Sequence, residues 1–375
     1  MHKIEIISTG LIYRNPLPHV YSRQAIHPSV LQLPCGDLLA GMSIGEAFES
    51  PDSKAYLARS CDNGETWELE QKLYEGSEEH PSSEGVRISL VDKGEVAAYL
   101  LSANRTRKDA GLTNPDNLGF VETEFLLTRS ADGGHTWERP AKFDPPLTGP
   151  AFEICCPIKV LRDGRWILPT QTWMGWDGYC PNGFKMVAFV SEDRGKTWPG
   201  YMDVMSDDKN EIIYWESKIV EFGDERLLAA AWAYDRIRKY DLENCYAVSS
   251  DKGKTFSRPM STGLKGQTMT PMLIKNDKIL TIYRRIDKPG LWANISSLEK
   301  DKWINEFEKP LWGSDQGGLV SHGDNMARNF HALKFGAPSV IELKDGSIFI
   351  AFWCVEDCVY NIRWIKLKVE SENQI

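Results

Sequence analysis

The stretch Ser60-Cys-Asp-Asn-Gly-Glu-Thr-Trp67 recurs three times along the chain with the same residue types at the same spacing. The copies read Ser130-Ala-Asp-Gly-Gly-His-Thr-Trp137, Ser191-Glu-Asp-Arg-Gly-Lys-Thr-Trp198 and Ser249-Ser-Asp-Lys-Gly-Lys-Thr-Phe256. In such a stretch the Ser and Asp oxygens accept backbone N–H bonds, Gly takes a conformation that other residues avoid, and the aromatic residue anchors the turn. One Asp per turn is too few for calcium, which takes about six to eight oxygen ligands. We therefore predict structural turns, each joining the third and fourth strands of a repeated unit.

A second pattern sets the number of units. An apolar strand, a tight polar turn and another apolar strand recur with turns at Gly36, Gly94, Gly164, Glu225, Lys278 and Gly346. Gly, Asn or Asp at a bend between two apolar runs is a strong signal for a β-hairpin. Six similar all-β units predict a six-bladed β-propeller. We expect residues 1–375 to form a single domain, with the strand at 3–11 completing the last blade and closing the ring.

The composition narrows the classes of function. The chain has 375 residues, 42% of them hydrophobic, and a net charge of −9. The acidic balance argues against a nucleic-acid binder, which normally shows a basic face. No apolar run reaches the ~18 residues of a membrane span. Eight cysteines are too few for a disulfide scaffold. Polar residues interrupt the N-terminus where a signal peptide needs an apolar stretch, so we expect a cytoplasmic protein.

The repeated S-x-D-x-G-x-T-W stretch resembles the Asp-box of the sialidase superfamily, whose members are six-bladed propellers. The resemblance implies glycoside hydrolysis with an arginine triad, an Asp acid/base, and a tyrosine nucleophile activated by a glutamate. Trp215-Glu-Ser-Lys-Ile-Val-Glu221 resembles the family's N-E-x-x-V-V-E strand and gives Glu216 the glutamate's role, while Arg236 lies near the second arginine's place. Ile26 stands where the first arginine is expected, and Phe335-Gly-Ala-Pro338 lacks the tyrosine.

Propeller geometry selects further candidates without the family. The hairpin turns and Asp-box turns share one end, so the other end is a mouth formed where inner strands open and second strands close, a usual place for ligands. The predicted site residues there are Glu153, Glu216, His27, Glu84, Gln267, Trp173, Arg236, Arg284, Arg285 and Asp287. Neighbouring strand residues point to opposite faces, so only one of Arg284 and Arg285 can face the mouth. The alternative for this pair is an inter-blade salt bridge with Asp287.

Two carboxyl groups are what glycoside hydrolysis requires, and Glu153 and Glu216 are the predicted pair. Our first hypothesis is an exo-acting glycoside hydrolase acting on a terminal acidic sugar, with Arg284 or Arg285 gripping the sugar carboxylate. The alternatives are a glycan-binding propeller without turnover and a polysaccharide lyase with His27 as base. For His27 alone, a hydrogen-bonded structural histidine is the favoured interpretation. We expect a carbohydrate partner, no nucleic acid, no membrane, no metal and no organic cofactor, and the sequence does not indicate an oligomeric state.

Overall fold

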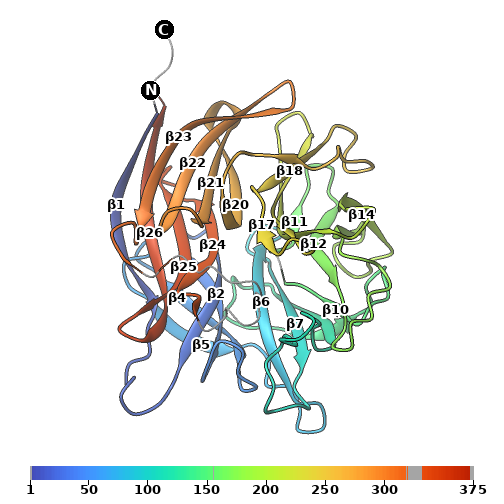
Figure 1. Ribbon diagram of the computed structural model, residues 1–375. Helices are drawn as coiled ribbons and strands as arrows, with labels where there is room; N and C mark the ends of the chain where they lie inside the picture. Colours follow the sequence, from blue (N-terminus) through green and yellow to red (C-terminus); the bar gives the residue numbers. More distant parts are fainter. Residues whose placement is uncertain (1, 155, 318, 320–331, 372–375) are drawn as a thin grey trace.

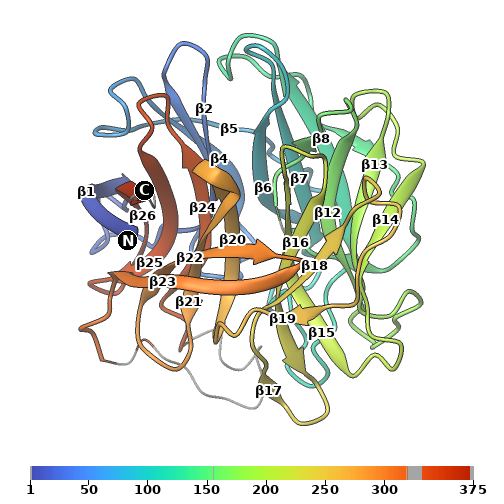
Figure 2. The same cartoon turned by 90° about the horizontal axis from the view of Figure 1, so that it is seen from above.

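The computed structural model describes residues 2–154, 156–317, 319 and 332–371. In these ranges the strands form six antiparallel sheets, which are the six predicted blades. Figures 1 and 2 show the blades following one another around a ring in sequence order. The inner strand of the first blade contacts the inner strands of both the second and the sixth blades, which closes the circle. The predicted six-bladed β-propeller is confirmed.

Each blade is a sheet of four or five strands. Blades 1 to 3 contain β2 (Gln24–Gln32), β3 (Leu38–Gly45), β4 (Lys54–Ser60), β5 (Glu68–Lys72); β6 (Ser82–Leu90), β7 (Val96–Asn104), β8 (Thr123–Ser130), β9 (Ala141–Phe143); and β10 (Ala151–Phe152), β11 (Lys159–Val160), β12 (Trp166–Trp173), β13 (Met186–Ser191), β14 (Gly200–Met205). Blades 4 and 5 contain β15 (Ile212–Glu221), β16 (Leu227–Asp235), β17 (Tyr240–Asp241), β18 (Cys245–Ser249), β19 (Met260–Ser261); and β20 (Gly266–Ile274), the 3₁₀ turn η1 (Lys275–Asp277), β21 (Lys278–Arg285), β22 (Leu291–Glu299), β23 (Lys302–Trp312). Blade 6 contains β24 (Phe335–Glu342), β25 (Ile348–Glu356), β26 (Val359–Ser371) and β1 (His2–Tyr13).

The N-terminal strand closes the ring as predicted. β1 pairs antiparallel with β26 from His2–Ser371 to Tyr13–Ile362, so the two ends of the chain share one sheet. Figure 1 shows β1 in blue beside the red β26. The pairing ties the segment that leads into the first blade to the last blade through main-chain hydrogen bonds, with β1 as the outer strand of that sheet.

The four Asp-box turns join third to fourth strands, as predicted. In the first box, the Ser60 hydroxyl donates to Asp62 at 2.7 Å, and the Gly64 N–H donates to Ser60 Oγ at 2.8 Å. The N–H of Thr66 donates to Asp62 Oδ1 at 2.9 Å, and the indole of Trp67 donates to the Gly64 carbonyl. These bonds replace the ladder bonds that the turn lacks, so the box is a structural staple.

Two details differ from the sequence prediction. In blade 5 the bend lies at Asn276 and Asp277, which have positive φ, rather than at Lys278, which opens β21. In blade 3 the inner strand is split into β10 and β11, which pair with opposite ends of β12. In the part of the chain that the structure describes, no helix is long and apolar enough to cross a membrane.

Candidate active site in the propeller mouth

A repeated backbone irregularity places side chains in the mouth. Within the described residues, four inner strands carry a β-bulge with a non-glycine residue in the left-handed region: His27 (φ 54°), Glu216 (φ 53°), Thr268 (φ 53°) and Ala337 (φ 47°). Each lies nine or ten residues before the turn residue predicted for its hairpin. Bulges redirect side chains, and strained conformations of this kind cluster at functional sites. All four residues line one cavity.

This cavity has a volume of about 240 Å³ and lies at the mouth end of the ring. Its ionisable lining residues are His27, Glu49, Glu84, Arg87, Glu153, Glu216 and Arg284. Its aromatic lining residues are Phe48, Phe120, Phe152, Trp173, Trp215, Trp232 and Trp353. A largely apolar wall with a few convergent polar groups is typical of a small-molecule site.

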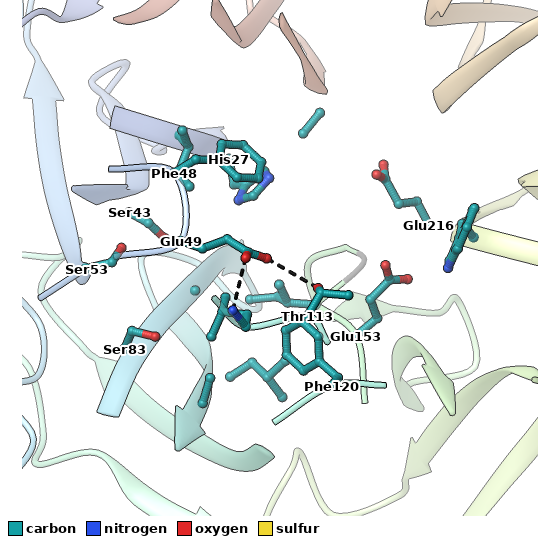
Figure 3. A pocket seen from close by; sticks show the side chains of 18 of the residues that line it. His27, Ser43, Phe48, Glu49, Ser53, Ser83, Thr113, Phe120, Glu153 and Glu216 are labelled. Carbon is teal, nitrogen blue, oxygen red and sulfur yellow. Dashed lines mark hydrogen bonds between the residues drawn. The ribbon is translucent and has the colours of Figure 1, made fainter. Parts of the chain in front are cut away.

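Glu49 is a half-buried carboxyl group that the sequence reasoning missed. Its Oε2 accepts the Leu112 N–H at 3.0 Å, and its Oε1 accepts the Thr113 hydroxyl at 3.3 Å (Figure 3). Burial raises the pKa of Glu49, although these hydrogen bonds and the charge of Arg105 oppose the shift. A carboxyl group with a raised pKa retains its proton to higher pH and can act as a general acid.

Glu153 and Glu216 lie on the side of the cavity opposite His27 and Phe48 (Figure 3). Glu216 sits at the bulge of β15, and the Lys218 ammonium lies 3.5 Å from its carboxylate. Glu153 follows β10; its N–H donates to the Gln171 carbonyl, and its own carbonyl accepts the Thr170 hydroxyl at 2.6 Å. The structure therefore brings the two predicted catalytic glutamates into one cavity.

His27 lies between aromatic and cationic groups. Its ring packs edge-on against Phe48, with centroids 5.5 Å apart, and against Trp353. Burial first, then the charges of Arg87 and Arg284, lower its pKa to about 3. The imidazole is therefore neutral over the physiological pH range and is a weak base.

Arg284 is the arginine of the predicted pair that lines the cavity. It is 6% exposed; its Nε and Nη2 donate to Gln267 Oε1 at 3.0 and 2.6 Å, and its Nη1 donates to the Phe335 carbonyl at 2.7 Å. Gln267 does not line the cavity but donates in turn to Asp241 at 2.8 Å. Gln267 thus supports Arg284 from behind.

Arg285 points away from the cavity, because the next residue along a strand faces the other side. Its guanidinium pairs with Asp287 at 2.6 Å and Glu308 at 2.8 Å, and stacks over Trp292 at 4.6 Å. Arg285 and Asp287 therefore form the salt bridge of the alternative prediction, but its placement between blades was wrong, because Arg285, Asp287 and Glu308 all belong to blade 5. Arg236, an exposed residue beyond β16, stacks over Phe184 and donates to the Asn210 carbonyl outside the cavity.

The two remaining predicted residues line the cavity in supporting positions. Glu84 is 2% exposed and pairs with Lys54 at 3.1 Å; burial raises its pKa while Lys54 lowers it. The Trp173 indole donates to the Leu118 carbonyl at 2.7 Å, which ties the loop after β7 to blade 3. Among the described residues, no group of three or more His, Cys, Asp and Glu side chains is placed to hold a metal ion.

The comparisons with known proteins agree with this fold. Residues 36–350 match the family described as BNR repeat-like domain. A protein of unknown function from Dyadobacter fermentans has a TM-score of 0.72 and 18% identity, over 98% of this chain and 99% of that one. No curated protein matches the sequence.

Two solved enzymes share the architecture. The NanB sialidase of Streptococcus pneumoniae has a TM-score of 0.67 and 12% identity, over 96% of this chain and 70% of that one. The intramolecular trans-sialidase of Ruminococcus gnavus, solved with oseltamivir carboxylate, has a TM-score of 0.65 and 13% identity, over 98% of both chains. At these identities the likeness shows the fold alone. The predicted resemblance to the Asp-box propellers is confirmed.

Proposed function

The chain belongs to the BNR repeat-like domain family, and from this premise we propose that it is an exo-acting glycoside hydrolase that removes a terminal acidic sugar. One observation carries the proposal. Glutamates in different electrostatic environments face a single cavity that also contains a buried arginine. Carboxyl groups whose environments differ in this way are suited to separate acid and base roles.

Glu49 is the proposed general acid. Cleavage of a glycosidic bond requires a proton on the leaving oxygen, and a carboxyl group with a raised pKa can supply it near neutral pH. Burial raises the pKa of Glu49, and its hydrogen bonds to Leu112 and Thr113 fix the carboxyl group at the cavity wall. On proton transfer, the pair of electrons of the glycosidic bond goes to the departing oxygen.

Glu216, assisted by Glu153, is the proposed nucleophile or general base on the side of the sugar opposite Glu49. Either it attacks the sugar carbon as a nucleophile or it takes a proton from an attacking water. Lys218 contacts the Glu216 carboxylate at 3.5 Å and its carbonyl at 3.0 Å, which limits the positions that the side chain can adopt. Glu216 and Glu153 face Glu49 across the cavity (Figure 3), as the two halves of the reaction require.

Arg284 is the proposed partner of the sugar carboxylate. A guanidinium carries five N–H donors. The described hydrogen bonds of Arg284 use three of them, on Gln267 and Phe335. The two that remain can bind a carboxylate in a bidentate manner.

The rim of the cavity supports the exo mode in this proposal. Leu112, Thr113, Leu118 and Phe120 from the loop after β7 line the cavity. The Phe120 N–H donates to the Met174 carbonyl at 3.0 Å, which fixes this loop against blade 3. A mouth covered on one side favours the end of a glycan over an internal segment.

Release of free sugar from a panel of acidic and neutral aryl glycosides tests the proposal. We expect turnover of an acidic glycoside, its loss in Glu216→Gln, and its retention in Glu221→Gln, a control at the other end of β15. If the acidic glycosides raise the melting temperature but no sugar is released, the protein is a glycan-binding propeller and the proposal is wrong.

A second candidate, a polysaccharide lyase, is favoured by the position of the neutral His27 beside Arg87 and Arg284. Such an enzyme neutralises a uronate carboxylate and removes the proton on the neighbouring carbon, and the electron pair left behind forms a C=C bond as the glycosidic oxygen departs. The lowered pKa of His27 makes it a weak base, which places this candidate second. An unsaturated product that absorbs ultraviolet light, lost in His27→Ala but retained in Glu216→Gln, would identify a lyase.

A further inference from the structure

Blade 2 differs from the other blades at the mouth. Its inner strand β6 pairs with β7 from Ser82 to Leu90 without a bulge. The residue nine positions before its turn is Gly85, which has no side chain to direct. Two residues further along, Arg87 is 7% exposed and lines the main cavity. It also lines a second cavity of about 130 Å³, which shares Glu216 and Ala337 with the first.

Arg87 donates hydrogen bonds into both neighbouring blades. Its Nη1 donates to the His27 carbonyl in blade 1 at 3.1 Å, and its Nη2 donates to the Ile154 carbonyl in blade 3 at 3.3 Å. Ile154 directly follows Glu153. One guanidinium therefore connects the backbone at two candidate catalytic residues.

Both carbonyls belong to backbone that lies outside the strand pairing. His27 falls in the register gap between Ile26 and Ser29. Ile154 falls between β10 and β11. A carbonyl withdrawn from the ladder needs another donor, and a charged donor forms a stronger bond than a neutral one. In blade 4 the Lys218 ammonium acts in the same way on the Glu216 carbonyl, at 3.0 Å.

We propose that Arg87 is a positioning residue whose two carbonyl contacts set the directions in which His27 and Glu153 enter the cavity. A left-handed residue such as His27 persists only where its surroundings hold it, and Arg87 is a donor that holds its carbonyl. This inference rests on the proposed function, because Arg87 is given a role in positioning the groups of that reaction and no reaction of its own. Lysine cannot replace this arginine, since an ammonium lacks the planar fork that reaches two carbonyls.

Two substitutions separate the effect of the positive charge of Arg87 from that of its planar guanidinium, which reaches both carbonyls. Arg87→Met removes both, and Arg87→Lys keeps the charge. Arg59→Met is the matched control: Arg59 is 6% exposed and also donates to a carbonyl of the next blade, that of Gly133 at 3.0 Å, but it does not line the cavity.

Each variant is assayed for kcat and KM, for the pKa of His27 by NMR, and for melting temperature. In Arg87→Met we expect kcat to fall about 100-fold with a smaller change in KM, and the His27 pKa to rise because a neighbouring cation is lost. In Arg87→Lys we expect kcat to fall about tenfold while the His27 pKa stays low. Arg59→Met should lower only the melting temperature.

A crystal structure of Arg87→Met provides a readout that needs no substrate. We expect His27 to leave its left-handed conformation and the Glu153 carboxylate to move. If both groups stay in place, or if kcat in both Arg87 variants equals that of the wild type, Arg87 is merely structural and the inference is overturned. A wild-type protein without hydrolysis, but with the expected displacement in this structure, refutes the proposed function and leaves the positioning role standing.

Discussion

At the Asp-box end, four blades build the same turn from the same residues, whereas at the mouth end the equivalent position of five inner strands holds His27, Gly85, Glu216, Thr268 and Ala337. The turn backbone repeats in these four blades, and the bulge repeats in four of the inner strands, although β6 has none. Only at the Asp-box end do the side chains repeat together with the backbone, because the turn has the same structural role in every blade that carries it. A mouth that binds an asymmetric ligand needs a different group from each blade. The residue type therefore differs from blade to blade there, although the position in the inner strand is equivalent.

The two ends also respond to pH in opposite directions. Hydrogen bonds from Thr66, Thr197 and Thr255 lower the pKa values of Asp62, Asp193 and Asp251 to about 2. Their contribution to stability is therefore complete above the unfolded value of ~3.9 and is lost as the pH falls toward 2. The raised pKa of Glu49 means that the folded state holds its proton more tightly. Its contribution is complete below the unfolded value of ~4.3 and is lost as the pH rises through the folded pKa.

The largest effect should come from the acid at the mouth. Glu49→Gln removes the proposed proton donor, and we expect kcat/KM to fall about 10²–10⁴-fold while stability changes little. In the wild type, kcat/KM should decline as the pH rises through the raised pKa of Glu49. A pH–rate profile of both proteins checks this, and an unchanged decline in Glu49→Gln would assign the proton to another group.

The adjacent arginines offer the next test. Arg284→Lys breaks the fork on Gln267 and Phe335, and we expect kcat/KM for an acidic glycoside to fall about 10²–10³-fold. Arg285→Lys changes a neighbour that faces Asp287 and Glu308, and should stay within a few-fold of the wild type. Steady-state kinetics on both variants decide the matter. Equal losses of kcat/KM in the two variants would mean that facing the cavity does not distinguish Arg284 from Arg285 in function.

A smaller effect is expected at the Asp-box end, on stability alone. The box serines Ser60, Ser130, Ser191 and Ser249 are at most 1% exposed. Each accepts a backbone N–H and donates to its Asp, so Ser→Ala should lower the free energy of unfolding by about 1–3 kcal/mol. Chemical denaturation of the four variants measures this. Comparable losses of stability in all four variants, with unaltered kcat/KM, would support a purely structural role for the Asp-box end. A loss of activity would contradict that role.

The smallest effect concerns the strain of the bulges. A non-glycine residue in the left-handed region costs about 1–2 kcal/mol, which glycine avoids at an entropic cost of about 0.5–1 kcal/mol. Ala337→Gly should therefore leave the free energy of unfolding unchanged or raise it by up to ~1 kcal/mol. Ala351→Gly, in the regular part of β25, should lower it by more than ~1 kcal/mol through lost burial and added chain entropy. Matched denaturation curves test both, and equal losses would argue against strain at the bulge.

Local patterns were sufficient to predict the blades. Gly36, Gly94 and Gly346 mark hairpin bends with positive φ, and each full Asp-box closes a third strand. These features depend on a few neighbouring residues, so they are readable in a single sequence. The split inner strand of blade 3 was not predicted, because the break depends on pairing with β12 and not on neighbouring residues. The blade 5 bend at Asn276 and Asp277 follows the local turn pattern, and the prediction at Lys278 placed it too late.

The site was only partly predictable for the same reason. The position of His27 and Glu216 where inner strands open brought them into the candidate set, and strand alternation separated Arg284 from Arg285. Glu49 was missed because its environment depends on Leu112 and Thr113 in a loop of another blade. Arg87 was missed because two of its hydrogen-bond partners are carbonyls in two other blades. Nothing near either residue in the sequence reports these contacts, although counting nine residues back from each turn would have identified the bulge positions.

The central claim is that the mouth, and not the Asp-box end, binds and cleaves an acidic sugar. A crystal structure of the Glu216→Gln variant with an uncleaved acidic aryl glycoside tests it most directly. We expect the sugar carboxylate on Arg284, the glycosidic oxygen next to Glu49, and the ring between Glu49 and the side of the cavity that Glu153 lines. A glycoside bound outside this cavity, or bound within it with its carboxylate away from Arg284, would contradict the account.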